Sequence, residues 1–199
     1  MGRQLQRQSI RGSRGFSLTE LVVTIAIILI LTGMAIPSLM RAYEAYRYNN
    51  AASGVAGVLK LTRFEAIRRN QQVKCQIQQS GTDWIIWADT TPNGAADPSE
   101  PQYLLTGSVS VLSGSGLPSS SAIATSVGAL GLTALASGNI VIFDARGAVI
   151  LPGTQPPVYV VYIGNAARPD LGYRAVVLLP SGVVHVWTAP STGPWQQVS

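Results

Sequence analysis

The most regular pattern in the chain is an uninterrupted apolar stretch near its start. Residues 21–40 carry no charged side chain, and the apolar run extends back to Phe16 with a single carboxylate, Glu20. About 20 apolar residues is the length that an α-helix needs to cross the ~30 Å hydrocarbon core of a bilayer. The pattern therefore predicts a membrane-spanning helix over residues 16–40.

Beyond Met40 the apolar positions form a broken stripe at helical spacing, which predicts that the helix continues over residues 41–70 as the spine of a folded head. Gly54 and Gly57 each lower helix propensity by about 1 kcal/mol and mark either close packing or flexibility. The stripe consists of Ala42, Ala45, Tyr46, Ala52, Val55, Val58, Leu59, Leu61, Thr62, Ala66 and Ile67. Four members of the stripe are expected to pack against a sheet, namely Leu59, Thr62, Ala66 and Ile67. The neighbouring residues Arg63, Arg68 and Arg69 are expected to face water.

From Gln71 the apolar period changes to two, which is typical of strands with one buried face. Residues 71–89 predict a hairpin with its turn at Ser80-Gly81-Thr82, and residues 107–138 predict a long Ser/Gly/Ala-rich loop with one or two short strands. Further strands are predicted at Ile140–Phe143, Val149–Leu151, Val158–Ile163, Ala175–Leu179 and Val183–Trp187. Residues 71–199 therefore predict a β-rich head, and the fold class is α+β, one helix packed on antiparallel sheet.

Composition narrows the function classes. The length of 199 residues fits one globular domain. The single cysteine, Cys75, excludes an internal disulfide and is expected to be a buried small hydrophobe. The single histidine, His185, lies on a predicted strand without a recognisable nucleophile around it, so the chain is not expected to be an enzyme, and no cofactor is expected.

The formal charge of +5 is unevenly distributed. Residues 1–15 contain four arginines and no acid, and removing those four from the 14 basic residues leaves ten against nine acidic ones, a net charge of +1. Four arginines before an apolar span predict a cytoplasmic N-terminus, with the head on the other side of the membrane, by the positive-inside rule.

The sequence GFSLTE from Gly15, followed by the apolar run, resembles the class III signal of type IV pilins and type II secretion pseudopilins. The resemblance implies that a prepilin peptidase cuts after Gly15, removes the basic leader 1–15 and N-methylates Phe16. It also implies that residues 16–40 become the core of a filament built with other pilins or pseudopilins. Pro37 matches the proline that kinks the helix in this family.

Glu20 lies at the edge of the apolar span, where a carboxylate costs roughly 2.5–3.5 kcal/mol on membrane-insertion scales. The simple interpretation is that it lies among the cytoplasmic headgroups. Given the resemblance, cleavage exposes a cationic amine on Phe16, and the amine of one subunit would neutralise Glu20 of its neighbour. Because buried charges persist when they are paired, Glu20 is expected to set register during assembly.

The head resembles the H-type minor pseudopilins of type II secretion and the FimT-like minor pilins, in which a long helix carries two small antiparallel sheets. This resemblance rests on the hairpin, on IVIFDARGAV from Ile140 and on RAVVLLPSGVVHVW from Arg174. It implies a pilin-like fold in the bacterial inner membrane, assembly at or near a filament tip, and partners in a secretion or pilus assembly platform. A minor pseudopilin is the first hypothesis, and a FimT-like minor pilin for pilus assembly or DNA uptake is the alternative.

A candidate metal site lies in the segment at residues 89–100. Asp89, Asn93, Asp97 and Glu100 stand at positions 1, 5, 9 and 12 of an EF-hand-like spacing, with Gly94 at position 6. Two features argue against calcium, namely Thr91 at position 3 and the predicted strands on both sides of the segment. Asn-Gly and Asp-Pro are also ordinary turn sequences, so a simple turn explains the segment as well.

Nucleic-acid binding is not expected. FimT-like proteins linked to DNA uptake carry a C-terminal Gly-Arg-x-Arg element, whereas the matching positions here are Gly182-Val183-Val184-His185, without either arginine. A basic stripe remains on the helix and just after it, and such a stripe is more often a solvated face. It consists of Lys60, Arg63, Arg68, Arg69 and Lys74.

Overall fold

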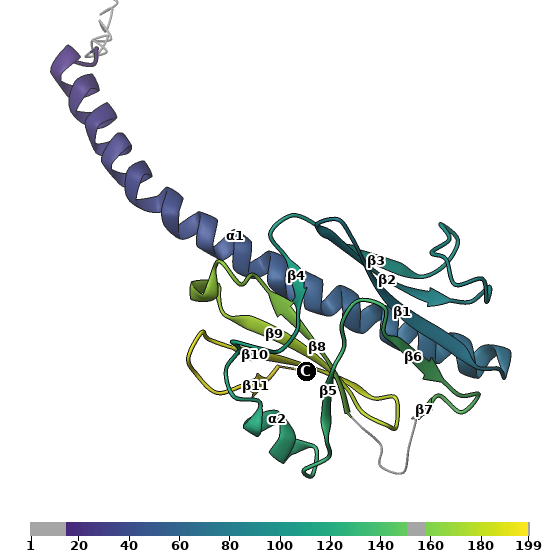
Figure 1. Ribbon diagram of the computed structural model, residues 1–199. Coiled ribbons are helices and arrows are strands. Elements are labelled where there is room, and N and C mark those ends of the chain that lie inside the picture. The colour runs from purple at the N-terminus through teal and green to yellow at the C-terminus, as the bar shows by residue number, and fades with distance from the viewer. Residues whose placement is uncertain (1–14, 151–157, 199) are drawn as a thin grey trace, which may run out of the picture. The chain divides into compact units, whose positions relative to one another are not determined.

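The computed structural model describes residues 15–150 and 158–198, so the leader before Gly15 lies outside it. The chain divides into two compact units, Met1–Arg41 and Ala42–Ser199. Helix α1, Leu18–Arg69, begins in the first unit and ends in the second, which confirms the long helix expected from the apolar pattern (Figure 1). The second part of this helix belongs to the same unit as the sheets.

Within its described residues the head contains two sheets and two short helical segments (Figure 1). The five-stranded sheet has the order β3-β2-β1-β6-β7, and the six-stranded sheet has the order β11-β10-β9-β8-β4, with β5 also paired to β8. The strands of the first sheet are β1 Val73–Ser80, β2 Asp83–Asp89, β3 Gln102–Leu105, β6 Ile140–Phe143 and β7 Val149–Ile150. Those of the second are β4 Ser110–Leu112, β5 Leu132–Ala134, β8 Val158–Gly164, β9 Tyr173–Leu178, β10 Val184–Ala189 and β11 Gln196–Gln197. The helical segments are α2 Ser121–Ser126 and the 3₁₀ turn η1 Pro169–Leu171.

The strand predictions are confirmed in type, with differences at the ends. β1 and β2 pair in a hairpin whose closing pair is Ser80 with Asp83. Strand β3 was missed, because four residues after a turn-rich segment carry little periodicity. The pairing is antiparallel except between β5 and β8, where Leu132 faces Val158 in parallel register. Leu151, predicted at the end of a strand, lies outside the described residues.

The main core lies between α1 and the inner faces of both sheets. Leu59, Thr62 and Ala66 are buried there, as the stripe predicts. The stripe is wrong at four positions, because Ala42, Tyr46, Leu61 and Ile67 are exposed. Tyr48, Ala51 and Ala56 are buried instead. The buried face thus lies slightly to one side of the predicted one, since the sheets select the positions that meet them.

Gly54 is a point of close packing, because a Cβ at this position would overlap the ring of Tyr103 on β3. Gly57 has open space around it. Of the two interpretations of these glycines, close packing therefore holds for Gly54.

A second core covers the outer face of the six-stranded sheet, so β8 and β9 are buried on both faces. Ile123 of α2 is fully buried in it, and Trp195 donates from Nε1 to the carbonyl of Pro118 at 3.2 Å and contacts the ring of Tyr162. The segment expected to be a loop thus contains a helical turn. A short apolar motif can anchor it because the sheet offers an apolar surface.

The two sheets are joined where two turns meet beside α1. The backbone N–H of Val149 donates to the carbonyl of Pro180 at 2.9 Å, and Arg63 Nε donates to the carbonyl of Gly147 at 3.0 Å. Arg63 is therefore half-buried, which corrects the expectation that it faces water. Gly182, with φ of +78°, lies against this carbonyl.

Replacing Gly182 by alanine is expected to destabilise the head by more than about 2 kcal/mol. The left-handed backbone costs an alanine about 1–2 kcal/mol, and its Cβ would also overlap the carbonyl oxygen of Gly147. Gly81→Ala is the matched control, because Gly81 has φ of +63° but open space around it. Thermal unfolding should show a larger loss for Gly182→Ala, and equal losses would contradict a role for the contact between the turns.

Candidate functional site

The proposed cleavage point lies just before helix α1. Gly15 and Phe16 precede the first helical residue, Leu18, and Phe16 is 78% exposed. A Cβ atom added at Gly15 would meet no atom of the described chain within 4 Å, its two chain neighbours aside. The Gly15–Phe16 peptide bond is therefore outside the helix and open to another protein, and nothing within the described chain requires a glycine there.

Glu20 lies in the first turn of α1 and is exposed. Among the described residues no basic group forms an ion pair with it. The N-terminal turn of a helix favours a negative charge, because unpaired N–H groups point toward it. A cation that neutralises Glu20 in an apolar environment must therefore come from outside the described chain or from a newly formed terminus.

The segment after Glu20 exposes apolar side chains on all sides. Residues 21–40 are all exposed in the described chain. One described helix, α1, is long and apolar enough to cross a membrane. The hydroxyls of Thr24 and Thr32 donate to the carbonyls of Leu21 and Ile28 at 2.8 and 2.7 Å, so these donors are satisfied within the helix. Such a surface requires a cover of lipid or of other apolar helices.

Pro37 lies inside α1, and the helix continues through it without interruption. Proline removes one N–H and crowds the carbonyl four residues earlier, which here belongs to Gly33. The described helix is therefore not locally melted at Pro37. The kink remains a prediction.

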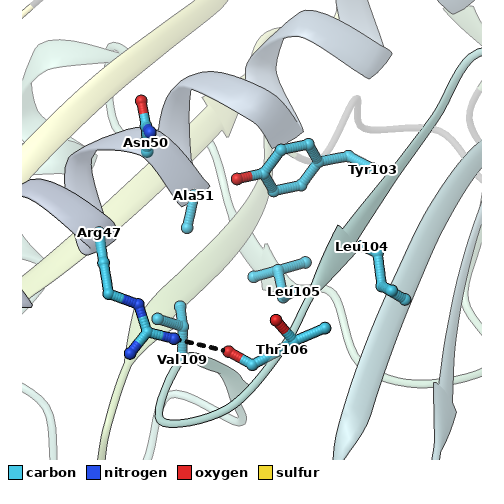
Figure 2. A pocket seen from close by; sticks show the side chains of 8 residues that line it. All are labelled: Arg47, Asn50, Ala51, Tyr103, Leu104, Leu105, Thr106 and Val109. Atoms are coloured by element: carbon cyan, nitrogen blue, oxygen red, sulfur yellow. Dashed lines mark hydrogen bonds between the residues drawn. The ribbon is translucent and has the colours of Figure 1, made fainter.

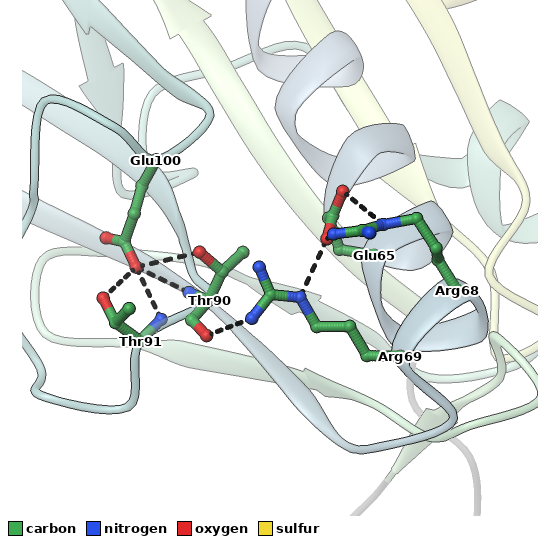
Figure 3. A network of polar contacts seen from close by, with 6 residues as sticks. All are labelled: Glu65, Arg68, Arg69, Thr90, Thr91 and Glu100. Atoms are coloured by element: carbon green, nitrogen blue, oxygen red, sulfur yellow. Dashed lines mark hydrogen bonds and ion pairs between the residues drawn. The ribbon is translucent and has the colours of Figure 1, made fainter.

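The segment with the EF-hand-like spacing forms a loop whose carboxylates accept hydrogen bonds from the chain itself (Figure 3). Glu100 Oε1 accepts from the backbone N–H groups of Thr90 and Thr91 at 2.7 and 2.8 Å and from both threonine hydroxyls. Burial by itself would raise the pKa of Glu100, but these bonds and one from the Asp97 N–H hold it below its usual value.

The other loop acceptors are also directed to protein donors. Asp97 Oδ2 accepts from Asn93 Nδ2 at 2.8 Å, and Asp89 Oδ2 accepts from Gln76 Nε2 at 2.7 Å, whereas the buried Asp89 Oδ1 has no hydrogen-bond partner in the described chain. No three His, Cys, Asp or Glu side chains within residues 15–150 and 158–198 form a group able to hold a metal ion. The calcium hypothesis is therefore not supported.

The basic stripe is largely engaged within the chain (Figure 3). Arg68 and Arg69 both contact Glu65, at 2.7 and 2.9 Å, and the hydrogen bond from Arg68 is the main cause that lowers the pKa of Glu65. Arg69 also donates to the carbonyl of Thr90 at 2.7 Å. With Arg63 held by Gly147, Lys60 and Lys74 are the stripe members for which the structure gives no such contact.

The positions that match the DNA-contact element lie in a turn and on a strand of the six-stranded sheet. Gly182 is buried in a turn, and Val184 begins β10. His185 Nδ1 lies 3.0 Å from Gln197 Nε2 on the neighbouring strand β11. His185 thus links two strands at the edge of the sheet.

Sequence reasoning did not single out Arg47, which links α1 to the segment after β3 (Figure 2). Its guanidinium donates to the carbonyl of Thr106 at 3.0 Å and to the hydroxyl of Ser108 at 3.2 Å, and it lies 3.6 Å from Glu44. A cavity of about 180 Å³ opens beside it. Thr106 and Ser108 are 59 and 61 residues away from Arg47 along the chain, so no local signal reveals these two contacts.

Cys75 is fully buried on β1, and burial raises the pKa of its thiol to about 12. We expect no modification by a thiol-specific reagent near pH 8 in the folded chain, because the thiolate is the reactive form. Rapid modification after addition of denaturant would confirm that the thiol is present and reduced. Equal rates before and after denaturation would contradict its burial.

A 52-residue helix with an exposed apolar first part, continuing into helix-backed antiparallel sheets, is the architecture of a pilin-like protein. Residues 10–36 match the model of the prokaryotic N-terminal methylation motif, and residues 51–182, well over half of the chain, match the model of the type II transport protein GspH. The chain therefore belongs to the GspH family.

The chain is also similar to individual proteins. Over 88 residues the chain is 33% identical to the pilin-like protein PilA1 of Thermus thermophilus, an alignment that covers 44% of this chain and 55% of that protein. The chain thus spans about half the length of this curated relative. Two crystal structures of the type IV minor pilin FimU of Pseudomonas aeruginosa also match. One has 17% identity and a TM-score of 0.42 over 72% of this chain and 93% of FimU. The other has 12% identity and a TM-score of 0.33 over 76% of this chain and 88% of FimU.

Proposed function

We propose that this chain is the precursor of a minor pseudopilin of a type II protein secretion system. A prepilin peptidase cleaves it after Gly15 and N-methylates Phe16. The mature subunit then enters a periplasmic pseudopilus together with other pseudopilins, at or near the tip. Glu20 guides assembly by pairing with the amine of a neighbouring subunit, and Pro37 kinks the helix.

The observation that carries this proposal is the order of features on one chain. A methylation motif at residues 10–36 precedes a GspH match at residues 51–182, and the helix that overlaps both matches exposes an apolar surface over residues 21–40. An exposed apolar helix of this length is not expected in a soluble enzyme or a free binding module. In a membrane-held filament subunit the same surface contacts lipid before assembly and other helices after it.

The proposed organisation follows from these parts. Residues 1–15 are the leader, residues 16–40 the transmembrane and filament-core helix, residues 41–70 the helix of the head, and residues 71–199 its β-rich part. The leader arginines favour a cytoplasmic N-terminus in the inner membrane and a periplasmic head. The assembly platform of the secretion machine would receive the subunit from the membrane.

A strain that lacks this chain tests the proposal. Export of type II substrates into the medium should fall and should be restored by the wild-type chain, while surface pili remain. Loss of pili with normal export would contradict the assignment to secretion.

The alternative is a FimT-like minor pilin, and the similarity to PilA1 favours keeping it. A DNA-uptake role is less favoured, because the matching C-terminal element lacks both arginines and three arginines of the basic stripe contact the chain itself. A mobility-shift assay with the mature chain in detergent distinguishes a DNA-uptake role from a role in secretion. A salt-sensitive shift would indicate phosphate contacts and favour DNA uptake.

A further inference from the structure

Two tyrosines on α1 are exposed immediately after the apolar span. Tyr43 and Tyr46 are 62% and 60% exposed, whereas the other five tyrosines of the chain are buried or half-buried. Their spacing of three residues places them on one face of the helix. We refer to Tyr43 and Tyr46 together as the tyrosine pair.

The tyrosine pair lies at the right distance from the span for a membrane interface. At 1.5 Å per residue, Tyr43 and Tyr46 follow Met40 by about 5 and 9 Å along the helix. The polar zone of a bilayer extends roughly 5–8 Å beyond the hydrocarbon core on each side. Helical side chains also lean toward the N-terminus, so both rings point back toward the span.

The residues around the tyrosine pair along α1 are charged, which suits the polar side of a membrane interface. Arg41 and Arg47 flank the pair, and Glu44 lies between its two members, 3.6 Å from Arg47. Tyrosine is enriched at such interfaces because its ring is apolar and its hydroxyl is polar.

We propose that the tyrosine pair is an interfacial belt that holds the head against the lipid headgroups before the subunit enters a filament. The occupant of this exposed face is the bilayer surface, to which the span connects it without a break in sequence. This inference rests on the proposed membrane anchoring. In this proposal the tyrosine pair contacts lipid headgroups before assembly and contacts other subunits after assembly.

Spin labelling of the full-length chain in nanodiscs of phosphatidylethanolamine and phosphatidylglycerol tests the belt. Single cysteines replace Tyr46, Leu29 in the middle of the span, and Leu61, which is exposed on the same helix about 30 Å beyond Met40. The wild-type chain, with its buried Cys75, supplies the unlabelled baseline. Collision rates with oxygen and with a water-soluble nickel chelate report the depth of each label.

We expect the nickel chelate to reach the Tyr46 label several-fold less than the Leu61 label, and oxygen to reach the Leu29 label best. If the Leu29 label is in lipid but the Tyr46 label is as accessible as Leu61, the belt is overturned and the face is left for a protein partner. If the Leu29 label is itself accessible to nickel, membrane anchoring fails, and the belt fails with it.

A second set of variants keeps the reporter away from the belt. With a label on the exposed Asn50, the double change Tyr43→Ser and Tyr46→Ser should raise nickel accessibility, because the head is no longer held at the surface. Phe64→Ser, which changes an equally exposed aromatic residue farther along α1, should leave it unchanged. An Asn50 label that responds equally to both changes, or to neither, would overturn the belt.

Discussion

Replacing Glu20 by alanine is expected to block incorporation into filaments while cleavage after Gly15 continues. Glu20 is exposed and has no ion-pair partner within the described chain, so its partner belongs to the assembled state. In a packed helical core the carboxylate and the amine of a neighbouring Phe16 would form a buried pair. Removing one partner of such a pair costs about 3–5 kcal/mol, or roughly two to four orders of magnitude in the association constant.

The assay for this prediction separates processing from assembly. Mature and precursor forms are resolved in membrane fractions, and incorporation is measured in filaments isolated from overproducing cells. Glu20→Gln should fail as Glu20→Ala does, since it keeps the size and loses the charge. Asp83→Ala, which removes a carboxylate in the β1–β2 hairpin, is the matched control and should assemble normally. Normal assembly of Glu20→Ala would contradict the pairing.

Replacing Gly15 by valine is expected to abolish processing, so that the uncleaved precursor accumulates in the membrane. A Cβ atom at position 15 would have open space around it within the described chain, so the folded head should be unaffected. Loss of cleavage would then report a steric requirement of the peptidase. A β-branched side chain also restricts the extended segment that the enzyme must bind.

Gly57→Ala is the control for this experiment. Gly57 likewise has open space around it, and alanine in a helix interior is favoured over glycine by about 1 kcal/mol. This variant should be processed and folded as the wild type is. Normal cleavage of Gly15→Val would contradict the assignment of the cleavage point, whatever its effect on assembly.

The parts of this protein that act through linear sequence could be predicted from it. The span needs only length and absence of charge, and Gly15, Phe16, Glu20 and Pro37 are placed by their spacing along one helix. The hairpin from Val73 to Asp89 was predictable because alternation with a two-residue turn leaves few other structures.

The details of the head depended on contacts that no local pattern encodes. Arg63 meets Gly147 across 84 residues, and the side chain of the buried Arg174 donates to Asn49 across 125 residues. The stripe put Tyr46 in the core instead of Tyr48, because a pattern interrupted by Gly54 and Gly57 leaves the direction of the buried face open by about one residue.

Mass spectrometry of the mature protein tests the central claim most directly. The chain is isolated from the membranes of cells with an active prepilin peptidase, and its N-terminal peptide is sequenced. We predict a first residue of Phe16 that carries one N-methyl group, with residues 1–15 absent. A chain that retains residues 1–15 in those cells would contradict the account of this protein as a processed filament subunit.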